Sequence, residues 1–226
     1  MSDYTVEPGL SDGELIWREA PDESADTNIL RPVSNPFSLD GGLRLLKGPL
    51  GTGICKISAI KPENQCVKAP ARVFETQSEF KTAFNNGDLK TDFIAVVRFQ
   101  GPSANGMPEL HSLSPALGAL QDKGLKVGLV TDGRKSGASG KVPSAIHVSP
   151  EAANGGYLAR VQDGDVITLD CANGVLDIEA DLSSRRAKTI STNQQTFGMG
   201  RELFDVFRQN VSSADEGASP FRLAED

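Results

Sequence analysis

The chain has 226 residues and a formal net charge of −7, so it can hold one large domain or one domain with tails. The negative charge argues against a general role in binding nucleic acid or membrane surfaces. No apolar run approaches the roughly 20 residues that a membrane span needs, and residues 1–4 lack the basic and apolar regions of a signal peptide. These features predict a cytoplasmic protein that binds neither nucleic acid nor membranes.

The cysteines and histidines give no sign of a metal or disulfide site. Cys55, Cys66 and Cys171 are too few and too scattered for a disulfide framework or a Cys-x-x-Cys metal site. Cys55 and Cys171 lie in strand-like runs, where packing in the core is the expected role. His111 and His147 share no metal-ligand spacing. Since His147 lies in an apolar run, we expect a core residue there, with a catalytic histidine as the alternative.

The first 36 residues differ in composition from the rest of the chain. They are acidic and rich in Pro, Ser and Asp, which is typical of an interdomain linker or of an arm that lies on another surface. A disordered tail is the alternative. Trp17 is unusual in such a segment, and it therefore predicts a partner surface that this chain does not supply.

Strand and helix patterns begin at Gly41. Residues 54–60 alternate like a half-buried strand, and residues 71–74 resemble another. Residues 76–79 have the form of a capping box and are followed by apolar residues at helical spacing. Gly87 stands where a glycine would end this helix.

A strand–loop–helix–strand unit follows. Residues 93–99 are apolar nearly throughout, as in a strand covered on both faces, and residues 126–130 form a second such run. Between them, Ser114 can cap a helix that has Pro115 at its first position and ends at Gly124. Parallel strands joined in this way are expected to cross over right-handed.

Two unusual loops leave the same edge of this unit. Loop 100–110 follows the first strand and loop 131–142 the second, so both lie at the carboxyl ends of parallel strands. Ligands of open α/β sheets bind at such an edge. Glu109 and Ser136 are therefore expected to converge, although they lie far apart in the sequence.

Residues 133–141 suit an anion better than a bare turn, because they hold three glycines, two serines and three cations. They match neither of two familiar signatures. A P-loop needs Gly six residues before its lysine, where this chain has Lys135, and a hydroxyl residue after it, where the chain has Val142. A nucleophile elbow needs Gly two residues after its serine, where Lys141 follows Ser139. A plain glycine-rich connection is the alternative.

The remaining patterns complete a mixed sheet. Residues 145–148 predict a short strand, and residues 149–151 the start of a helix. Two strand-like runs, 165–169 and 175–179, flank Asn173-Gly174, which is a strong hairpin signal.

A last amphipathic helix is expected over residues 201–211, and the acidic segment after it is expected to be loose. Mixed strands with two or three helices imply an α/β or barrel-like domain over residues 37–195. This domain would lie between the arm of residues 1–36 and a C-terminal helix and tail, 196–226. The last helix would place three apolar side chains on one face: Leu203, Phe204 and Phe207.

Five ordered blocks of the sequence also form a pattern together: Val96-Val97-Arg98-Phe99-Gln100-Gly101-Pro102, Asn105-Gly106-Met107-Pro108-Glu109-Leu110-His111, Thr131-Asp132-Gly133-Arg134, Ser136-Gly137-Ala138-Ser139-Gly140-Lys141 and His147-Val148-Ser149-Pro150-Glu151-Ala152. Together they resemble the dihydroxy-acid/6-phosphogluconate dehydratase family. The first two blocks are most similar to its 6-phosphogluconate branch, which acts in the Entner–Doudoroff pathway of gluconate metabolism. The resemblance runs from about Leu10 to the early 180s and continues more weakly into the last helix.

The resemblance implies that this chain is the C-terminal part of such an enzyme. Family members look like two-domain proteins, in which a larger N-terminal domain carries the cysteines of a 4Fe–4S cluster. A smaller swivelling β/α domain, a barrel-like mixed sheet with flanking helices, closes over the site and is similar to a mobile domain of aconitase. Cys55, Cys66 and Cys171 match no cluster-ligand motif of the family, so the cluster is expected in the N-terminal domain. The full-length enzyme is expected to be a homodimer.

The reaction that the resemblance implies is a dehydration, from 6-phospho-D-gluconate to 2-dehydro-3-deoxy-6-phospho-D-gluconate and water. A proton leaves C2 and hydroxide leaves C3, and an iron of the cluster can act as a Lewis acid on that hydroxyl. By resemblance, Ser136 is the base, and Glu109 supplies an oxygen to a divalent ion such as Mg²⁺. The alternative for Glu109 is a glutamate at a helix N-terminus, which the helix dipole favours without a metal.

A serine hydroxyl is a very weak acid, so its alkoxide needs cations and hydrogen-bond donors around it. Arg134 is the candidate cation, and Ser139 would help to position the proton or the substrate. Gly133, Gly137 and Lys141 are assigned to binding the substrate's anionic groups.

Lys135 departs from the family pattern, in which Met is expected. A flexible cation beside the base would strengthen anion binding or distort the loop. Two other functions stay open: the domain of a dihydroxy-acid or other sugar-acid dehydratase, and a non-catalytic module that binds anions or partners through the same loop. Without its N-terminal domain, the chain is expected to be inactive.

Overall fold

The computed structural model describes residues 6–136, 140–190, 198 and 200–221. These residues belong to two compact units, Met1–Gly41 and Gly42–Asp226, which are taken separately below. Within the described parts of the chain, no helix is both long enough and apolar enough to cross a membrane.

The first unit contains a β-hairpin rather than only a linker. Strands β1 (Val6–Ser11) and β2 (Glu14–Glu19) pair antiparallel and are joined by Asp12-Gly13, both with positive φ. Asp-Gly favours the tight turns that connect such hairpins, so this signal was present in the sequence. Trp17 is 65% exposed on β2. A two-stranded hairpin by itself is marginally stable, so this one needs a further surface.

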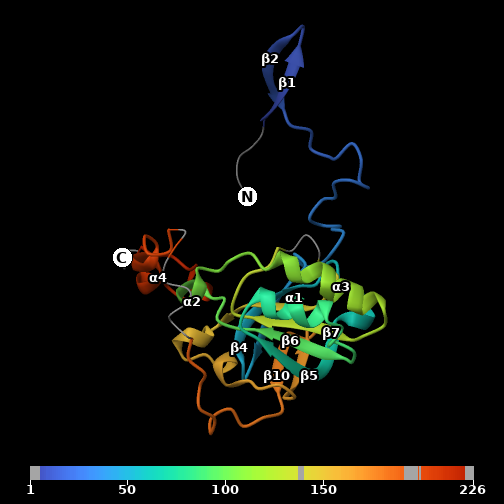
Figure 1. Cartoon of the computed structure of the whole chain (residues 1–226). Coiled ribbons are helices and arrows are strands. Elements are labelled where there is room, and N and C mark those ends of the chain that lie inside the picture. Colours follow the sequence, from blue (N-terminus) through green and yellow to red (C-terminus); the bar gives the residue numbers. More distant parts are fainter. Residues whose placement is uncertain (1–5, 137–139, 191–197, 199, 222–226) are drawn as a thin grey trace. The chain divides into compact units, whose positions relative to one another are not determined.

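The second unit is a closed barrel of eight strands in the order β10-β3-β4-β8-β7-β6-β5-β9, which confirms the prediction of a mixed, barrel-like α/β fold (Figure 1). Strands β5, β6, β7 and β8 run parallel as neighbours, whereas β4 pairs antiparallel with β3 and β8, and β9 with β5 and β10. The short pairing of β10 with β3 closes the ring. The strands are β3 (Leu43–Gly48), β4 (Gly51–Lys56), β5 (Cys66–Phe74), β6 (Phe93–Val97), β7 (Val127–Thr131), β8 (Ser144–Ser149), β9 (Val166–Asp170) and β10 (Val175–Ile178).

Four α-helices and five 3₁₀-helices connect the strands in the described residues. The α-helices are α1 (Gln77–Asn85), α2 (Pro102–Asn105), α3 (Ser114–Asp122) and α4 (Asp205–Asn210). The 3₁₀-helices are η1 (Pro62–Asn64), η2 (His111–Leu113), η4 (Ala152–Asn154), η5 (Tyr157–Arg160) and η7 (Ala214–Glu216).

The apolar side chains form two clusters on the two faces of the parallel strands. Ile94 and Val96 point into the barrel, and Phe93, Ala95 and Val97 pack in the outer cluster with residues of α1 and α3. Figure 1 shows these two helices against β6 and β7. Strand β6 therefore reads as apolar throughout because both of its faces are covered, as predicted.

Helix α1 and the last hairpin follow the sequence prediction closely. The Thr76 side chain accepts a hydrogen bond from Glu79 N, and Gly87 follows the helix with φ +73°. The Glu79 carboxylate accepts from Glu75 N instead of Thr76 N, so the reciprocal half of the expected capping box is shifted by one residue. Strands β9 and β10 pair antiparallel around Gly174, which has φ +74°.

Three predicted helix boundaries were wrong. Leu113 is the N-cap of α3, because η2 precedes the helix and places Ser114 at its first position. No α-helix begins at 149–151, where a cis Ser149–Pro150 bond leads instead into η4. Helix α4 is shorter than the expected 201–211, and part of the tail folds into η7.

Candidate functional site

The loops after β6, β7 and β8 are tied together by one buried carboxylate. Asp132 directly follows β7, has no exposed surface, and accepts hydrogen bonds from Phe99 N (3.1 Å), Gln100 N (2.9 Å) and Ala152 N (2.9 Å). Burial raises the pKa of this carboxyl to about 6, while the three N–H donors oppose that rise. Asp132 therefore holds the edge of the sheet at which a site was expected.

Glu151 fixes the first of these loops from a second direction. Its carboxylate accepts from Ser103 N (2.8 Å) and Ala104 N (3.0 Å) at the start of α2. Gly101 packs directly on this carboxylate, since a Cβ on Gly101 would lie 2.2 Å from Glu151 Oε2. Burial raises the pKa of Glu151, and the two backbone donors oppose the rise. The sequence reasoning assigned no role to Glu151 or Asp132, although an acidic residue directly after a buried strand is a usable signal.

Glu109 and Ser136 converge as predicted. Ser136 N donates to Glu109 Oε1 at 2.7 Å, across 27 positions of sequence. Glu109 also forms a parallel β-bridge with Arg134, and Leu110 N donates to Arg134 O at 3.1 Å. Arg134 Nε donates to Met107 O at 2.8 Å, so the two loops are joined by both main-chain and side-chain contacts.

Gly133 is where the two loops come closest. A Cβ at this position would lie 2.6 Å from the Cβ of Gln100, so only glycine allows this approach. Gly133 O accepts from His147 N at 2.9 Å, and Gly133 N donates to Thr131 Oγ1 at 2.9 Å. The residue thereby connects the ends of β7 and β8.

Lys135 does not lie on the loop surface as a flexible cation beside Ser136, which was the expectation for it. It is only 7% exposed, and its Nζ donates to Ser144 Oγ at 2.9 Å. Ser144 Oγ in turn donates to Val142 O at 3.0 Å. Burial lowers the pKa of Lys135, although the nearby Cys55 and Glu109 raise it. The side chain points inward because its long apolar stem fills the space that a methionine would fill.

The other sequence-predicted residues are less closely associated. Lys141 Nζ binds both carboxylate oxygens of Asp122, at 2.9 and 2.8 Å. Gly137 and Ser139 lie outside the described residues. His147 is half-buried with φ +56°, and its pKa is lowered by burial and by the charge of Arg134.

Backbone strain is concentrated at this edge. Phe99, Met107 and His147 adopt positive φ values of 61°, 51° and 56°, a conformation that side chains other than glycine's disfavour. Each of them belongs to a segment that contacts Asp132, Arg134 or Gly133. Such strain persists where the surrounding structure fixes the backbone, and it often marks a functional site.

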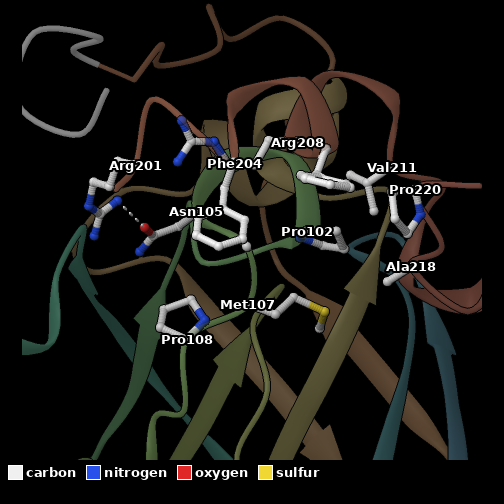
Figure 2. Close-up of a pocket in the computed structure, with 12 residues that line it drawn as sticks. Pro102, Asn105, Met107, Pro108, Arg201, Phe204, Arg208, Val211, Ala218 and Pro220 are labelled. Atoms are coloured by element: carbon white, nitrogen blue, oxygen red, sulfur yellow. Dashed lines mark hydrogen bonds between the residues drawn. The ribbon is translucent and has the colours of Figure 1, made fainter. Parts of the chain in front are cut away.

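A cavity of about 560 Å³ borders the loop that carries Glu109 (Figure 2). One part of its lining comes from α2 and the residues after it, and the other from the C-terminal segment that contains α4. The lining residues are Pro102, Asn105, Gly106, Met107, Pro108, Arg201, Phe204, Phe207, Arg208, Val211, Ala218 and Pro220.

The sequence was compared with known protein families. The family described as dihydroxy-acid/6-phosphogluconate dehydratase, C-terminal, matches residues 28–218. The chain belongs to this family. It contains all five blocks quoted above within that match.

Curated dehydratases of this family match nearly the whole chain. Phosphogluconate dehydratase of Pseudomonas aeruginosa is 56% identical over 220 residues, which cover 96% of this chain and 36% of the relative. Phosphogluconate dehydratase of Escherichia coli K12 is 50% identical over 222 residues, covering 97% and 37%. Dihydroxy-acid dehydratase of Ignicoccus hospitalis is 40% identical over 215 residues, covering 92% and 38%. The chain therefore spans less than two-fifths of the length of these dehydratases.

The described residues of this dehydratase chain do not fit an iron–sulfur cluster. Cys55 and Cys171 are buried and their sulfur atoms hydrogen-bond to each other at 2.7 Å, whereas Cys66 is exposed at the start of β5. No group of three His, Cys, Asp or Glu side chains in the described parts of the chain could hold a metal ion. The exposed Glu109 offers one carboxylate, which fits a Mg²⁺ ion that takes its other ligands from water, substrate or another chain segment.

Proposed function

We propose that this chain is the C-terminal catalytic domain of a 6-phosphogluconate dehydratase. The relatives named phosphogluconate dehydratase are 50–56% identical to it, against 40% for the dihydroxy-acid dehydratase, and this difference favours the phosphorylated substrate. The observation that carries a catalytic role is the contact of Ser136 N with Glu109 Oε1 at the strained edge of the barrel.

In this proposal the chain handles the proton at C2 of the substrate. Ser136 Oγ takes that proton, the C2–H electron pair forms the C2–C3 double bond, and the C3 hydroxyl leaves with its electron pair. The resulting enol becomes the 2-oxo acid. Arg134 lies next to Ser136 in the loop and stabilises the alkoxide by its charge, together with main-chain N–H groups such as that of Gly133.

The remaining roles are assigned to residues of the same loop. Glu109 holds Ser136 N with one oxygen, and its carboxylate would be one ligand of a Mg²⁺ ion that binds the substrate carboxylate. Ser139 positions the proton or the substrate, and Gly137 and Lys141 bind its anionic groups. For Lys141 this means exchanging the Asp122 carboxylate for the substrate.

A larger N-terminal domain completes the proposed enzyme. A 4Fe–4S cluster held there would supply the Lewis acid for the leaving hydroxyl. Residues 1–36 serve as the arm or linker toward it, residues 37–195 form the swivelling domain, similar to the mobile domain of aconitase, and residues 196–226 form a C-terminal helix and tail. We place the enzyme in the cytoplasm, as a homodimer.

The test is turnover by the chain joined to its cluster-bearing N-terminal part. Formation of the 2-oxo acid is measured with 6-phosphogluconate and with a 2,3-dihydroxy acid that lacks phosphate. We expect kcat/KM to favour 6-phosphogluconate by at least about 100-fold, since a site built for a polar group rejects an analogue without it. A preference for the dihydroxy acid would favour the other branch of the family. A loaded cluster without turnover of either acid would favour a non-catalytic anion-binding module.

A further inference from the structure

The cavity beside α2 has an unusual charge for this protein. The chain carries a net charge of −7, yet among the described residues the only charged side chains that line the cavity are Arg201 and Arg208, without a carboxylate. Its other walls include Phe204, Phe207 and Met107. A cleft with one sign of charge and apolar walls concentrates the electric field, and it attracts ions of the opposite charge.

Arg201 is held in place by a chain of polar side chains. Its Nη1 donates to Asn105 Oδ1 at 3.1 Å, the dashed contact in Figure 2. Asn105 Nδ2 donates to Gln100 Oε1 at 3.1 Å, and Gln100 Nε2 donates to Glu75 O at 2.7 Å. Gln100 N is one of the groups that Asp132 fixes. The Arg201 guanidinium is thus positioned relative to the loops of the candidate site.

The two arginines differ in their partners. Arg208 Nη2 contacts Asp205 Oδ1 at 3.1 Å, within the same helix, so a carboxylate already offsets much of its charge. The partner shown for Arg201 inside the cavity is the neutral amide of Asn105. Arg201 is therefore the stronger source of positive potential on this wall.

The cavity continues directly into the candidate site. Asn105, Met107 and Pro108 belong to its lining, and the next residue in the chain is Glu109. Met107 also contributes the carbonyl oxygen that accepts from Arg134 Nε. A substrate whose reacting carbons lie at Ser136 and Glu109 can extend its far end along this loop into the cavity.

We propose that this cavity is the subsite for the phosphate group of the substrate, a phosphorylated sugar acid, with Arg201 as its principal ligand. The inference rests on the proposed function for the identity of the substrate. A guanidinium presents a planar pair of N–H donors that match a phosphate, and such charge-assisted bonds strengthen where water is displaced by apolar walls. The reacting centre and the anion-binding subsite would then share one loop, residues 105–109.

Steady-state kinetics of the full-length enzyme test the subsite. We expect Arg201→Gln to raise KM for 6-phosphogluconate by roughly 10- to 100-fold, which corresponds to one charged hydrogen bond, with kcat changed by less than about threefold. KM for gluconate, which lacks the phosphate, should change by less than about twofold. Arg201→Lys should recover part of the loss, and Arg72→Gln, which removes a half-exposed arginine on β5, should change neither constant.

A second variant keeps the test valid if Arg201→Gln folds poorly. Asn105→Asp preserves an acceptor for Arg201 but adds a negative charge to the cavity wall, so it should weaken 6-phosphogluconate binding selectively. Binding of inorganic phosphate to the 226-residue chain, followed by ³¹P NMR, should fall in both variants. Equal KM changes for the phosphorylated and unphosphorylated acids, or phosphate binding that neither variant affects, would overturn the proposal. If the wild-type enzyme fails to dehydrate 6-phosphogluconate while phosphate binding still depends on Arg201, the proposed function fails and the anion subsite stands.

Discussion

Lys135 and Ser144 join the two ends of the loop that carries Ser136. Lys135 Nζ donates to Ser144 Oγ at 2.9 Å, and Ser144 lies just beyond the last residue of that loop, at the start of β8. The ammonium group is buried, with a neutral hydroxyl as its hydrogen-bond partner. Charge buried in this way is unfavourable, because it loses hydration that one hydroxyl replaces only in part.

Lys135→Met should therefore leave the domain as stable or more stable. A methionine of similar length fills the same space without a charge, and we expect the free energy of unfolding to stay equal or to rise by about 1 kcal/mol in urea denaturation at pH 7. The exposed Lys90→Met serves as the matched control. A loss of more than about 1 kcal/mol in Lys135→Met would show that the ammonium group stabilises the loop.

The pH dependence of the same variant has a definite sign. Burial lowers the pKa of Lys135 below 10.5, so between the lowered pKa and 10.5 the unfolded chain binds more protons than the folded chain. The wild type should therefore gain stability relative to Lys135→Met as pH rises through that window, and the difference should be constant below it. Urea unfolding of both proteins from pH 7 to pH 10.5 measures this, and a widening gap in favour of the variant would contradict it.

Asp132→Asn should be among the most damaging single substitutions at the barrel edge. The amide offers one acceptor oxygen where the carboxylate serves three main-chain donors, so buried N–H groups lose their partner. We expect a loss of roughly 3–5 kcal/mol in the free energy of unfolding. Asp92→Asn is the control, because exposed Asp92 accepts only from Lys126 N, and it should lose about 1 kcal/mol or less. Equal losses in the two variants would mean that Asp132 is not a special tie.

Ser136→Ala tests the proposed base in the full-length enzyme. Its hydroxyl acts only while the C2 proton moves, so kcat should fall by about 10²–10⁴-fold with KM and the cluster absorbance nearly unchanged. The main-chain bond from Ser136 N to Glu109 does not involve the hydroxyl and should persist. Ser139→Ala should show a smaller loss. A fall of less than about tenfold in Ser136→Ala would reassign the base.

His147 is the alternative base, and its backbone conformation dictates the substitution. Asn tolerates the positive φ of this position better than most residues, so His147→Asn removes the imidazole without adding strain. If His147 is structural, the unfolding midpoint should fall while kcat changes by less than about threefold. A loss of kcat at unchanged stability would instead make His147 the proton acceptor.

Trp17 offers a readout of docking, because it is the single tryptophan of the chain. It is 65% exposed on β2, so its fluorescence should be red-shifted and accessible to quenchers in the 226-residue chain. Large exposed apolar side chains mark interaction surfaces, and we expect a blue shift when the N-terminal part of the enzyme is added. Trp17→Ala should weaken that association. An unchanged spectrum on mixing would argue that the hairpin docks elsewhere.

The sequence predicted what depends on neighbours in the chain. The apolar run of β6 and the Asn173-Gly174 turn are local signals, and both were interpreted correctly. The convergence of Glu109 with Ser136 followed from one topological rule for parallel strands. Where local signals competed, as at Ser114, the preceding 3₁₀ turn moved the helix start by one residue.

The contacts that define the site edge were beyond that reasoning because they join distant segments. Asp132 accepts from residues 33 and 32 positions before it and 20 after it. Arg98, part of a recognised motif, uses its Nη1 to bind the carbonyl oxygens of Leu158, Ala159 and Val161 rather than any ligand. Neither partner set has a spacing that a periodic pattern reveals.

The three bonds of Asp132 also limit how a substrate can enter. A loop that opened alone would leave a buried main-chain N–H or part of the carboxylate without its partner, which costs about 1–3 kcal/mol for each broken bond. A local lid is therefore disfavoured at this edge. Access is expected to depend on movement of the whole barrel as a rigid plug, so that Glu109 and Ser136 travel together and keep their spacing while the way in opens or shuts.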